Sequence, residues 1–108
     1  MLRPVPEPPT TDETLATSEA PVPDEALVPR ILAGETALFE LIMRRHNQRL
    51  YRAARAILND DAEAEDVMQE TYVRAFTHLG QFRGDALLST WLTRIAVHEA
   101  FARVRRRR

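Results

Sequence analysis

Hydrophobic residues recur at helical spacing over much of the chain, and no stretch of four or more residues alternates convincingly between apolar and polar positions. Between residues 36 and 58 the apolar positions fall three or four residues apart, with extra apolar residues widening the stripe near its start. This spacing predicts one long helix over residues 36–58. Its expected apolar stripe is Leu38, Ile42, Leu50, Ala54 and Ile57, widened by Phe39, Leu41 and Met43.

A second helix is predicted from residue 60 to about residue 78. Asn59, Asp60 and Asp61 offer caps, and Glu63 three residues after Asp60 makes an acidic analogue of the capping box. Gly80 is the expected stop. The predicted buried stripe is Ala64, Val67, Met68, Thr71, Tyr72, Ala75 and Leu79. The predicted exposed face carries Asp66, Gln69, Glu70, Val73 and Arg74.

A loop over residues 81–88 precedes the last predicted helix, which Ser89 caps and which runs from Thr90 onward. One apolar stripe of this helix is expected to face inward, and a second stripe predicts that the helix is covered on two sides. The first stripe is Trp91, Leu92, Ile95 and Ala96, and the second is Val97, Phe101 and Val104.

The N-terminal region differs in composition, because all seven prolines fall within residues 1–29. A short helix is expected over residues 24–33, with Asp24 as its cap, Pro29 either kinking it or delaying its start, and Gly34 as its stop. Residues 1–23 contain few large apolar groups and are predicted to be disordered. An alternative is that this acidic tail shields a basic surface.

The predicted fold is therefore all-α: an antiparallel bundle of three main helices plus a short N-terminal helix and a disordered tail. A length of 108 residues suits one small domain, here residues 24–108. The net charge of −1 hides an asymmetry, since residues 1–29 carry one Arg against six acids and residues 30–108 carry 14 Arg against 10 acids. Within the basic part, residues 60–70 hold six acids and no base, and residues 100–108 hold five Arg and no acid. This separation suggests two different partners.

Several classes of chemistry are disfavoured by composition. The chain has no Cys, its three glycines form no phosphate-binding loop, and none of His46, His78 and His98 follows an acid by three residues. No catalytic residue, metal site or cofactor is therefore expected, and the protein is predicted not to be an enzyme. No apolar run approaches the ~20 residues that span a bilayer, so a soluble cytoplasmic protein without a membrane partner is expected.

Two segments carry a family resemblance: AEDVMQETYVRA at residues 64–75 and FRGDALLSTWLTRIAV at residues 82–97. They resemble region 2 of bacterial sigma factors, most closely the extracytoplasmic-function (ECF) group of the sigma-70 superfamily. The resemblance implies that Asp66, Gln69 and Glu70 dock on the clamp coiled coil of the largest subunit of core RNA polymerase. Val73 and Arg74 share their predicted face and join the expected docking set. The alternative for this acidic face is an ordinary solvated surface.

For the loop, the resemblance implies capture of a base flipped from the non-template strand of the promoter −10 element. A glycine loop at a helix N-terminus offers a pocket, backbone donors and an acceptor for such a base. A plain interhelical turn is the alternative. The expected contacts are Phe82, Arg83, Gly84, Asp85, Ala86, Leu87, Leu88, Ser89 and Thr90. Because the family varies at residues 86–88, the sequence does not give the base preference.

The last helix is expected to continue this nucleic-acid surface, since Arg side chains neutralise phosphates. The predicted contacts are Trp91, Arg94, His98, Arg103 and Arg105. The family usually has Asn where this chain has His98, which leaves base readout there open. Core packing is the alternative for Trp91, and a solvated helix end is the alternative for the Arg run.

Together the motifs imply a transcription initiation factor domain that docks on core RNA polymerase and recognises and melts the −10 element, with an anti-sigma factor as a further partner. A sigma mimic or decoy that binds only an anti-sigma factor is the main alternative. A helix-turn-helix repressor is disfavoured by the long loop over residues 81–88. The family's second domain, which reads the −35 element, is not found in the sequence. The chain also ends within an Arg run without a cap, which indicates a piece of a longer protein.

Overall fold

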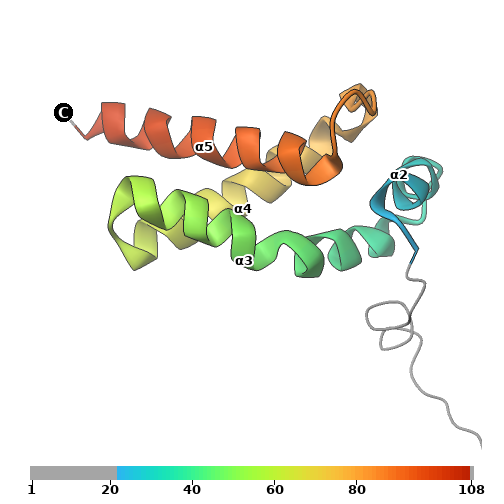
Figure 1. Ribbon diagram of the computed structural model, residues 1–108, viewed down its shortest axis with the longest axis horizontal. Coiled ribbons are helices and arrows are strands. Elements are labelled where there is room, and N and C mark those ends of the chain that lie inside the picture. The colour runs from blue at the N-terminus through green and yellow to red at the C-terminus, as the bar shows by residue number, and fades with distance from the viewer. Residues whose placement is uncertain (1–21, 108) are drawn as a thin grey trace, which may run out of the picture.

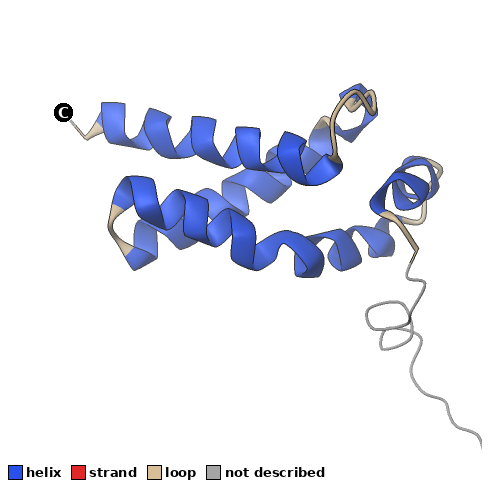
Figure 2. Cartoon of the chain, viewed as in Figure 1, coloured by secondary structure: helices blue, strands red, loops and turns tan. Residues whose placement is uncertain are grey.

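The computed structural model describes residues 22–107. The prediction of a disordered or shielding tail over residues 1–23 falls almost wholly outside these residues. In chain order the helices are α2 (Asp24–Leu32), α3 (Phe39–Leu58), α4 (Asp61–Thr77) and α5 (Leu88–Arg106), with 3-10 turns η1 (Thr36–Leu38) and η2 (Leu79–Gln81). Residues 22–107 contain no strand, so the all-α prediction is confirmed (Figure 2).

The three long helices form an antiparallel bundle in which α4 runs opposite to both α3 and α5 (Figure 1). Each of the three contacts the other two, because each has an apolar stripe that must be covered. The shorter α2 lies across the N-terminal end of α3 and also contacts η2. The predicted bundle with one short additional helix is therefore confirmed.

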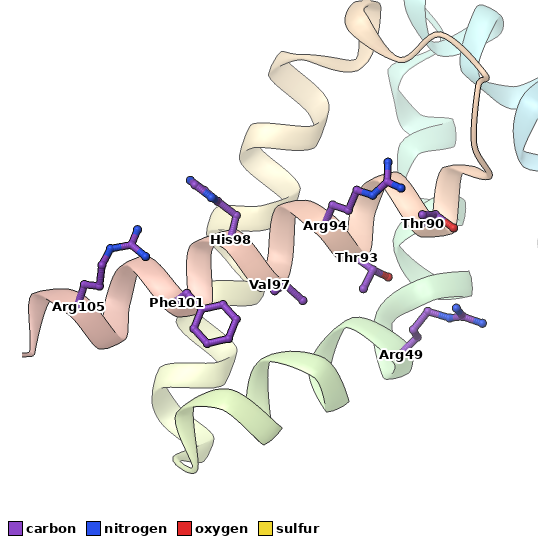
Figure 3. A pocket seen from close by; sticks show the side chains of 8 residues that line it. All are labelled: Arg49, Thr90, Thr93, Arg94, Val97, His98, Phe101 and Arg105. Carbon is purple, nitrogen blue, oxygen red and sulfur yellow. The ribbon is translucent and has the colours of Figure 1, made fainter.

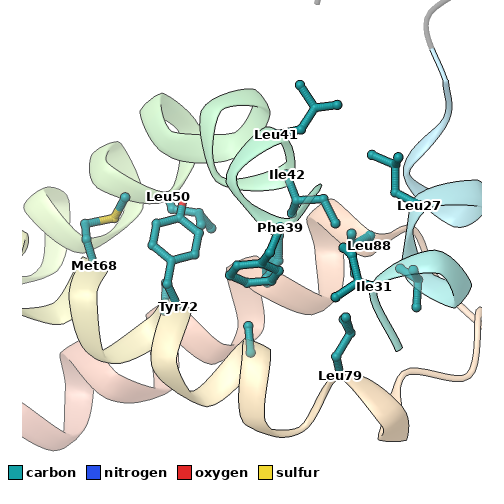
Figure 4. Close-up of a cluster of buried hydrophobic side chains, with 14 residues drawn as sticks. Leu27, Ile31, Phe39, Leu41, Ile42, Leu50, Met68, Tyr72, Leu79 and Leu88 are labelled. Atoms are coloured by element: carbon teal, nitrogen blue, oxygen red, sulfur yellow. The ribbon is translucent and has the colours of Figure 1, made fainter. Parts of the chain in front are cut away.

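The core has a larger and a smaller cluster. The larger one joins α2 to α3, α4 and α5, from Phe39 to Leu50 on α3 and from Met68 to Ala75 on α4 (Figure 4). The smaller cluster lies toward the other end of the bundle and consists of Ala54, Leu58, Ala64, Val67 and Ala100. All seven residues of the stripe predicted for α4 are buried. On α5, Leu92 and Ala96 are buried and Trp91 and Ile95 are half-buried, whereas Phe101 is 48% exposed, so the second stripe is only partly covered.

The predicted cap of α4 is confirmed, because the Asp60 carboxylate accepts a hydrogen bond from the backbone N–H of Glu63 at 2.9 Å. The Glu63 side chain instead forms an ion pair with Arg107, the residue that follows α5. The preceding helix ends where Asn59 adopts a left-handed conformation with φ of 56°. This residue type tolerates such a conformation because its short side chain can hydrogen-bond locally.

Three predicted helix signals were wrong. Ser89 does not cap α5. The helix begins one residue earlier, at Leu88, because the Leu88 side chain is buried in the core. Gly80 does not stop α4, because the chain continues from His78 into η2 and buries Leu79. Asp24 is the first residue of α2 and not its cap.

Instead of capping the helix, the Asp24 carboxylate contacts two basic side chains of α3. It accepts hydrogen bonds from Arg45 Nη1 at 2.8 Å and pairs with His46 Nε2 at 2.6 Å. Burial opposes ionisation of Asp24, but the hydrogen bonds from His46 and Arg45 outweigh it and lower the pKa of this carboxyl. This cluster fastens the first turn of α2 to α3. The helix starts at Asp24 and continues through Pro29, which contradicts the predicted delay of its start.

Candidate functional site

The acidic face of α4 forms one shallow depression, and the structure brings together most of the residues predicted to lie there. Its lining residues are Asp66, Gln69, Glu70 and Val73 of α4 and Arg103 of α5. All four α4 side chains are exposed, as their positions on the helix predict. The depression therefore combines two carboxylates, one amide and one apolar side chain on a single rigid helix.

Arg74 is exposed as predicted but is engaged within the domain. Its Nε atom lies 2.5 Å from Oε2 of Glu99 on α5, and the Glu99 side chain is almost completely buried. A buried carboxylate needs a charged or hydrogen-bonding partner, because its transfer from water is costly. Arg74 supplies that partner, so its main role in the isolated domain is to join α4 to α5.

Arg103 in the last turn of α5 and Arg107 directly after this helix also reach toward α4. Arg103 Nη1 lies 3.3 Å from Oδ2 of Asp66. Arg107 pairs with Glu63 and donates a hydrogen bond to the carbonyl of Leu58 at 3.0 Å. Residues four apart share a helix face, so both arginines point toward α4. The structure thus places Arg103 with the predicted polymerase contacts rather than with Arg94 and Arg105.

An apolar surface adjoins the acidic depression, and sequence reasoning missed most of it. Val73 is 65% exposed and Phe76, three residues on, is 44% exposed. The Phe76 ring packs edge-on against Phe39 at a centroid distance of 5.3 Å, which holds it in place. The signal available in the sequence was that Phe76 falls outside the buried stripe of α4.

The loop between η2 and α5 covers residues 82–87 and presents a mixed set of side chains. Arg83, Gly84, Asp85 and Leu87 are exposed, and Gly84 has a φ of +81° that suits glycine. In contrast, Leu88 is 1% exposed and belongs to the core, so it cannot contact a ligand without unfolding the helix start. The exposed surface of the loop therefore ends before Leu88 and is shorter than predicted.

Beside this loop, two aromatic rings support each other. Phe82 and Trp91 lie at a centroid distance of 5.5 Å and both are half-buried against the larger core cluster. Trp91 was predicted either to pack in the core or to contact a ligand. Both are possible, because one part of the ring packs inward and the other part is exposed. The exposed part lines a groove between α4 and α5 together with Arg94 and His98.

Arg94 and His98 form a ridge on α5, because a second groove follows their other side, between α5 and α3 (Figure 3). This α3–α5 groove is lined by Arg49, Thr90, Thr93, Arg94, Val97, His98, Phe101 and Arg105. Sequence reasoning predicted Thr90, Arg94, His98 and Arg105 as contacts. It missed Arg49, because the position of Arg49 relative to α5 depends on helix packing. It also missed Thr93, and it had assigned Val97 and Phe101 to a covered apolar stripe.

Metal and membrane sites are not indicated in the part of the chain that the structure describes. Residues 22–107 contain no group of three or more His, Cys, Asp or Glu side chains placed to hold a metal ion. Within the same residues, none of the helices combines the length and hydrophobicity needed to cross a bilayer.

Comparison with known proteins identifies the family to which the chain belongs. Residues 42–108 match the family Sigma-70 region 2. The chain is 36% identical over 77 residues to the RNA polymerase sigma-H factor of Pseudomonas aeruginosa, covering 71% of this chain and 40% of that protein. It is 36% identical over 83 residues to the ECF RNA polymerase sigma factor SigM of Mycobacterium tuberculosis, covering 77% of this chain and 42% of that protein.

A third relative is the ECF RNA polymerase sigma-E factor of Escherichia coli, 34% identical over 77 residues, with 71% of this chain and 40% of that protein covered. The chain thus spans about two fifths of the length of the curated relatives it matches. The matched segment contains α4, the loop and α5, which carry the surfaces described above. The chain therefore belongs to the Sigma-70 region 2 family, as a region 2 domain of the ECF sigma factor group.

Proposed function

We propose that this domain docks on core RNA polymerase and then recognises and opens the −10 element of promoters, as part of a transcription initiation factor. Polymerase binding is assigned to the acidic face of α4, and nucleic-acid binding to the loop over residues 82–87 and to α5. RNA synthesis belongs to the polymerase, so the domain itself needs no catalytic residue or cofactor. The proposed functional unit is residues 24–108, acting in the cytoplasm.

The docking half rests on one observation: Asp66, Gln69 and Glu70 line a single depression on α4. Two carboxylates with an amide between them favour a partner that presents Arg or Lys and hydrogen-bond donors. The neighbouring Val73 and Phe76 add apolar contact area, which such interfaces need at their centre. The clamp coiled coil of the polymerase's largest subunit is the partner proposed for this combined surface.

The nucleic-acid half rests on the loop and on the ridge of α5. Arg83 and Arg94 are exposed, and neither is among the arginines that form ion pairs within residues 22–107, so both are available to neutralise phosphates. Phe82 and Trp91 make a rigid aromatic support under the loop. A base that leaves the duplex needs stacking surfaces and hydrogen-bonding groups to offset the loss of its own stacking. We assign capture of a base from the non-template strand to this loop.

An anti-sigma factor is a further proposed partner, and a decoy that bound only such a factor is the alternative function. A decoy has no use for cationic side chains outside ion pairs. Arg83, Arg94 and Arg105 are such side chains among residues 22–107, which favours the nucleic-acid-binding function.

The docking half is tested with an Asp66→Ala, Glu70→Ala double variant, with binding to core RNA polymerase measured by co-purification and titration. Loss of both carboxylates is expected to weaken binding by more than about tenfold. Glu65→Ala is the matched control, because Glu65 is an exposed acid of α4 outside the depression. Undiminished polymerase binding by a double variant that retains its helical circular dichroism would refute the docking face.

The nucleic-acid half is tested by comparing single-stranded with duplex −10 DNA in the same binding assay. The proposed function predicts a preference for the single strand. A preference for the duplex would instead support a repressor, and no binding to either form would support the decoy.

A further inference from the structure

Helix α2 lies outside the segment that matches the family model, because the match begins at residue 42 and α2 ends at Leu32. Leu27, Val28 and Ile31 of this helix are buried and belong to the larger core cluster. They follow one face of α2, as an amphipathic helix requires. The packing of this face indicates which part of the bundle α2 serves.

The buried face of α2 packs where the loop over residues 82–87 is attached to the core. Leu79 of η2 lies shortly before the loop and Leu88 follows it directly, and each is 1% exposed. Both belong to the same cluster as Leu27 and Ile31, and Figure 4 shows these four side chains at one end of it. Helix α2 also contacts η2. The loop is thus anchored at both ends by core positions that α2 helps to bury.

Backbone hydrogen bonds close the loop at the same two points. The N–H of Phe82 donates to the carbonyl of Leu79 at 3.1 Å, and the N–H of Trp91 donates to the carbonyl of Leu87 at 3.1 Å. The rings of Phe82 and Trp91 lie at a centroid distance of 5.5 Å and pack against the larger cluster. A shift of Leu79 would therefore move the start of the loop together with the Phe82 ring.

A largely buried polar contact holds the first turn of α2 on the bundle. The Asp24 carboxylate contacts Arg45 and His46 of α3, and each of the three side chains is at most 21% exposed. Within the described part of the chain, Nη2 of Arg45 is buried without a hydrogen-bond partner. Loss of the Asp24 charge would leave this guanidinium without its acid in a mostly buried position, which is costly. A second ion pair of α2, between Arg30 and Glu35, is about half exposed and contributes less.

We propose that α2 is a positioning element for the loop over residues 82–87. The contact of Asp24 with Arg45 and His46 keeps this element on the bundle. Opening of α2 uncovers both loop ends, while the three long helices, which contact one another directly, stay assembled. The inference rests on the proposed function only for the purpose of the loop, since capture of a base is favoured by a preformed loop.

Hydrogen exchange in the 108-residue chain tests this link without nucleic acid or polymerase. The backbone amides of Phe82 and Trp91 report the two loop ends, and those of Ala54 and Ala100 report the smaller core cluster. In the wild type, the two loop amides should share the opening free energy of the α2 amides, which should lie below that of the Ala54 and Ala100 amides. Any other opening free energy of the loop amides would overturn the proposal.

Asp24→Asn should speed exchange of the α2 amides and of the Phe82 and Trp91 amides by one common factor of about 5- to 150-fold, because the contact that keeps α2 closed is weakened. Glu25→Gln is the matched control, since it removes an exposed acid from the same helix turn. Its exchange rates should equal those of the wild type. Faster exchange of the α2 amides alone would show that the loop does not depend on α2.

Trp91 is the single tryptophan of the chain, so its fluorescence reports the loop region specifically. Ile31→Ala should shift its emission to longer wavelength and raise its quenching by acrylamide, because the supporting Phe82 ring moves. Leu58→Ala is the control, because Leu58 is equally buried but belongs to the smaller cluster. This variant should leave the fluorescence of the folded protein unchanged. Equal changes in the two variants would reduce the role of α2 to general stability and refute the proposal.

Binding of a fluorescent single-stranded −10 DNA, followed by anisotropy, separates this inference from the proposed function. Ile31→Ala should bind the strand more weakly than Leu58→Ala does, and both should join core polymerase. If exchange and fluorescence respond as predicted while strand binding does not, α2 positions the loop as inferred and the assignment of base capture to the loop is wrong. If the wild type binds the strand but neither exchange nor fluorescence responds, the positioning role is overturned and the proposed function stands.

Discussion

Arg74 and Arg103 show that residue type alone does not decide a side chain's role. Both are arginines near the acidic face of α4, yet Arg74 serves the nearly buried Glu99 and Arg103 reaches the exposed Asp66. The difference lies in burial, because a buried carboxylate depends on its partner and an exposed one does not. Each role follows from helix phase and packing.

Arg103 has a consequence for docking, because it occupies one of the carboxylates that a partner would bind. We predict that Arg103→Gln raises affinity for core polymerase by up to about fivefold, since an exposed ion pair of ~0.2 to 1 kcal/mol no longer competes. Titration against wild type measures the change. Arg106→Gln is the control, as Arg106 is exposed and forms no ion pair within residues 22–107. Weaker binding of Arg103→Gln would show that Arg103 itself contacts the partner.

Asp24 is predicted to stabilise the domain in a pH-dependent way. At pH 7, Asp24→Asn should lower the free energy of unfolding by about 1 to 3 kcal/mol, because Arg45 and His46 lose a charged acceptor. The folded-state pKa of Asp24 lies below its ordinary value of 3.8, so this stabilisation is present above pH 3.8 and is lost as the pH falls through the lower folded value. Urea denaturation of both proteins at several pH values measures it.

The control for Asp24 is Glu25→Gln, which removes a neighbouring acid from the same helix turn without touching α3. Glu25 is exposed, so little change in unfolding free energy is expected. An equal loss in the two variants would mean that the helix dipole, and not the contact to Arg45 and His46, accounts for the effect.

At the scale of elements, α3 and α4 are held together partly by a buried phenol. Tyr72 donates a hydrogen bond to the carbonyl of Met43 at 3.2 Å, and burial raises the pKa of Tyr72 to about 12. Because this value lies above the ordinary 10.0, the neutral hydroxyl stabilises the fold fully below pH 10 and progressively less as the pH rises toward 12.

We therefore predict that wild type loses more stability between pH 10 and pH 12 than Tyr72→Phe does. Thermal unfolding of both proteins, followed by circular dichroism across this range, provides the comparison. Parallel loss in the two proteins would contradict the role of Tyr72, because the other titrating groups are common to both.

Helices were easier to predict than their ends. The buried stripe could be predicted completely, because the six buried residues of α4 and Leu79 of η2 follow one periodic pattern. The start of α5 and the stop of α4 could not, because burial of Leu88 and Leu79 overrode the local preferences of Ser89 and Gly80. Likewise, the acidic face follows from one helix, whereas the grouping of Arg49 with Phe101 depends on how two helices pack.

At the scale of the whole molecule, the bundle presents two chemically distinct surfaces on opposite flanks of α5. One flank joins the acidic depression of α4 through Arg103, and the other joins the cationic groove along α3. On the α4 flank, Arg74, Arg103 and Arg107 form ion pairs with acidic residues of the domain. Arginines without such ion pairs lie on the α3 flank. The proposed function assigns the acidic depression to a protein partner, and it assigns α5 and the loop over residues 82–87 to nucleic acid.

The most direct test of this assignment measures both activities on two variants of the same chain. The Asp66→Ala, Glu70→Ala variant should bind the single strand as wild type does but fail to join core polymerase. An Arg83→Ala, Arg94→Ala variant should bind core polymerase normally but lose affinity for the strand. This reciprocal loss is the result we predict from anisotropy with and without polymerase. If either folded variant lost both activities, or neither, the division of the bundle into two functional surfaces would be contradicted.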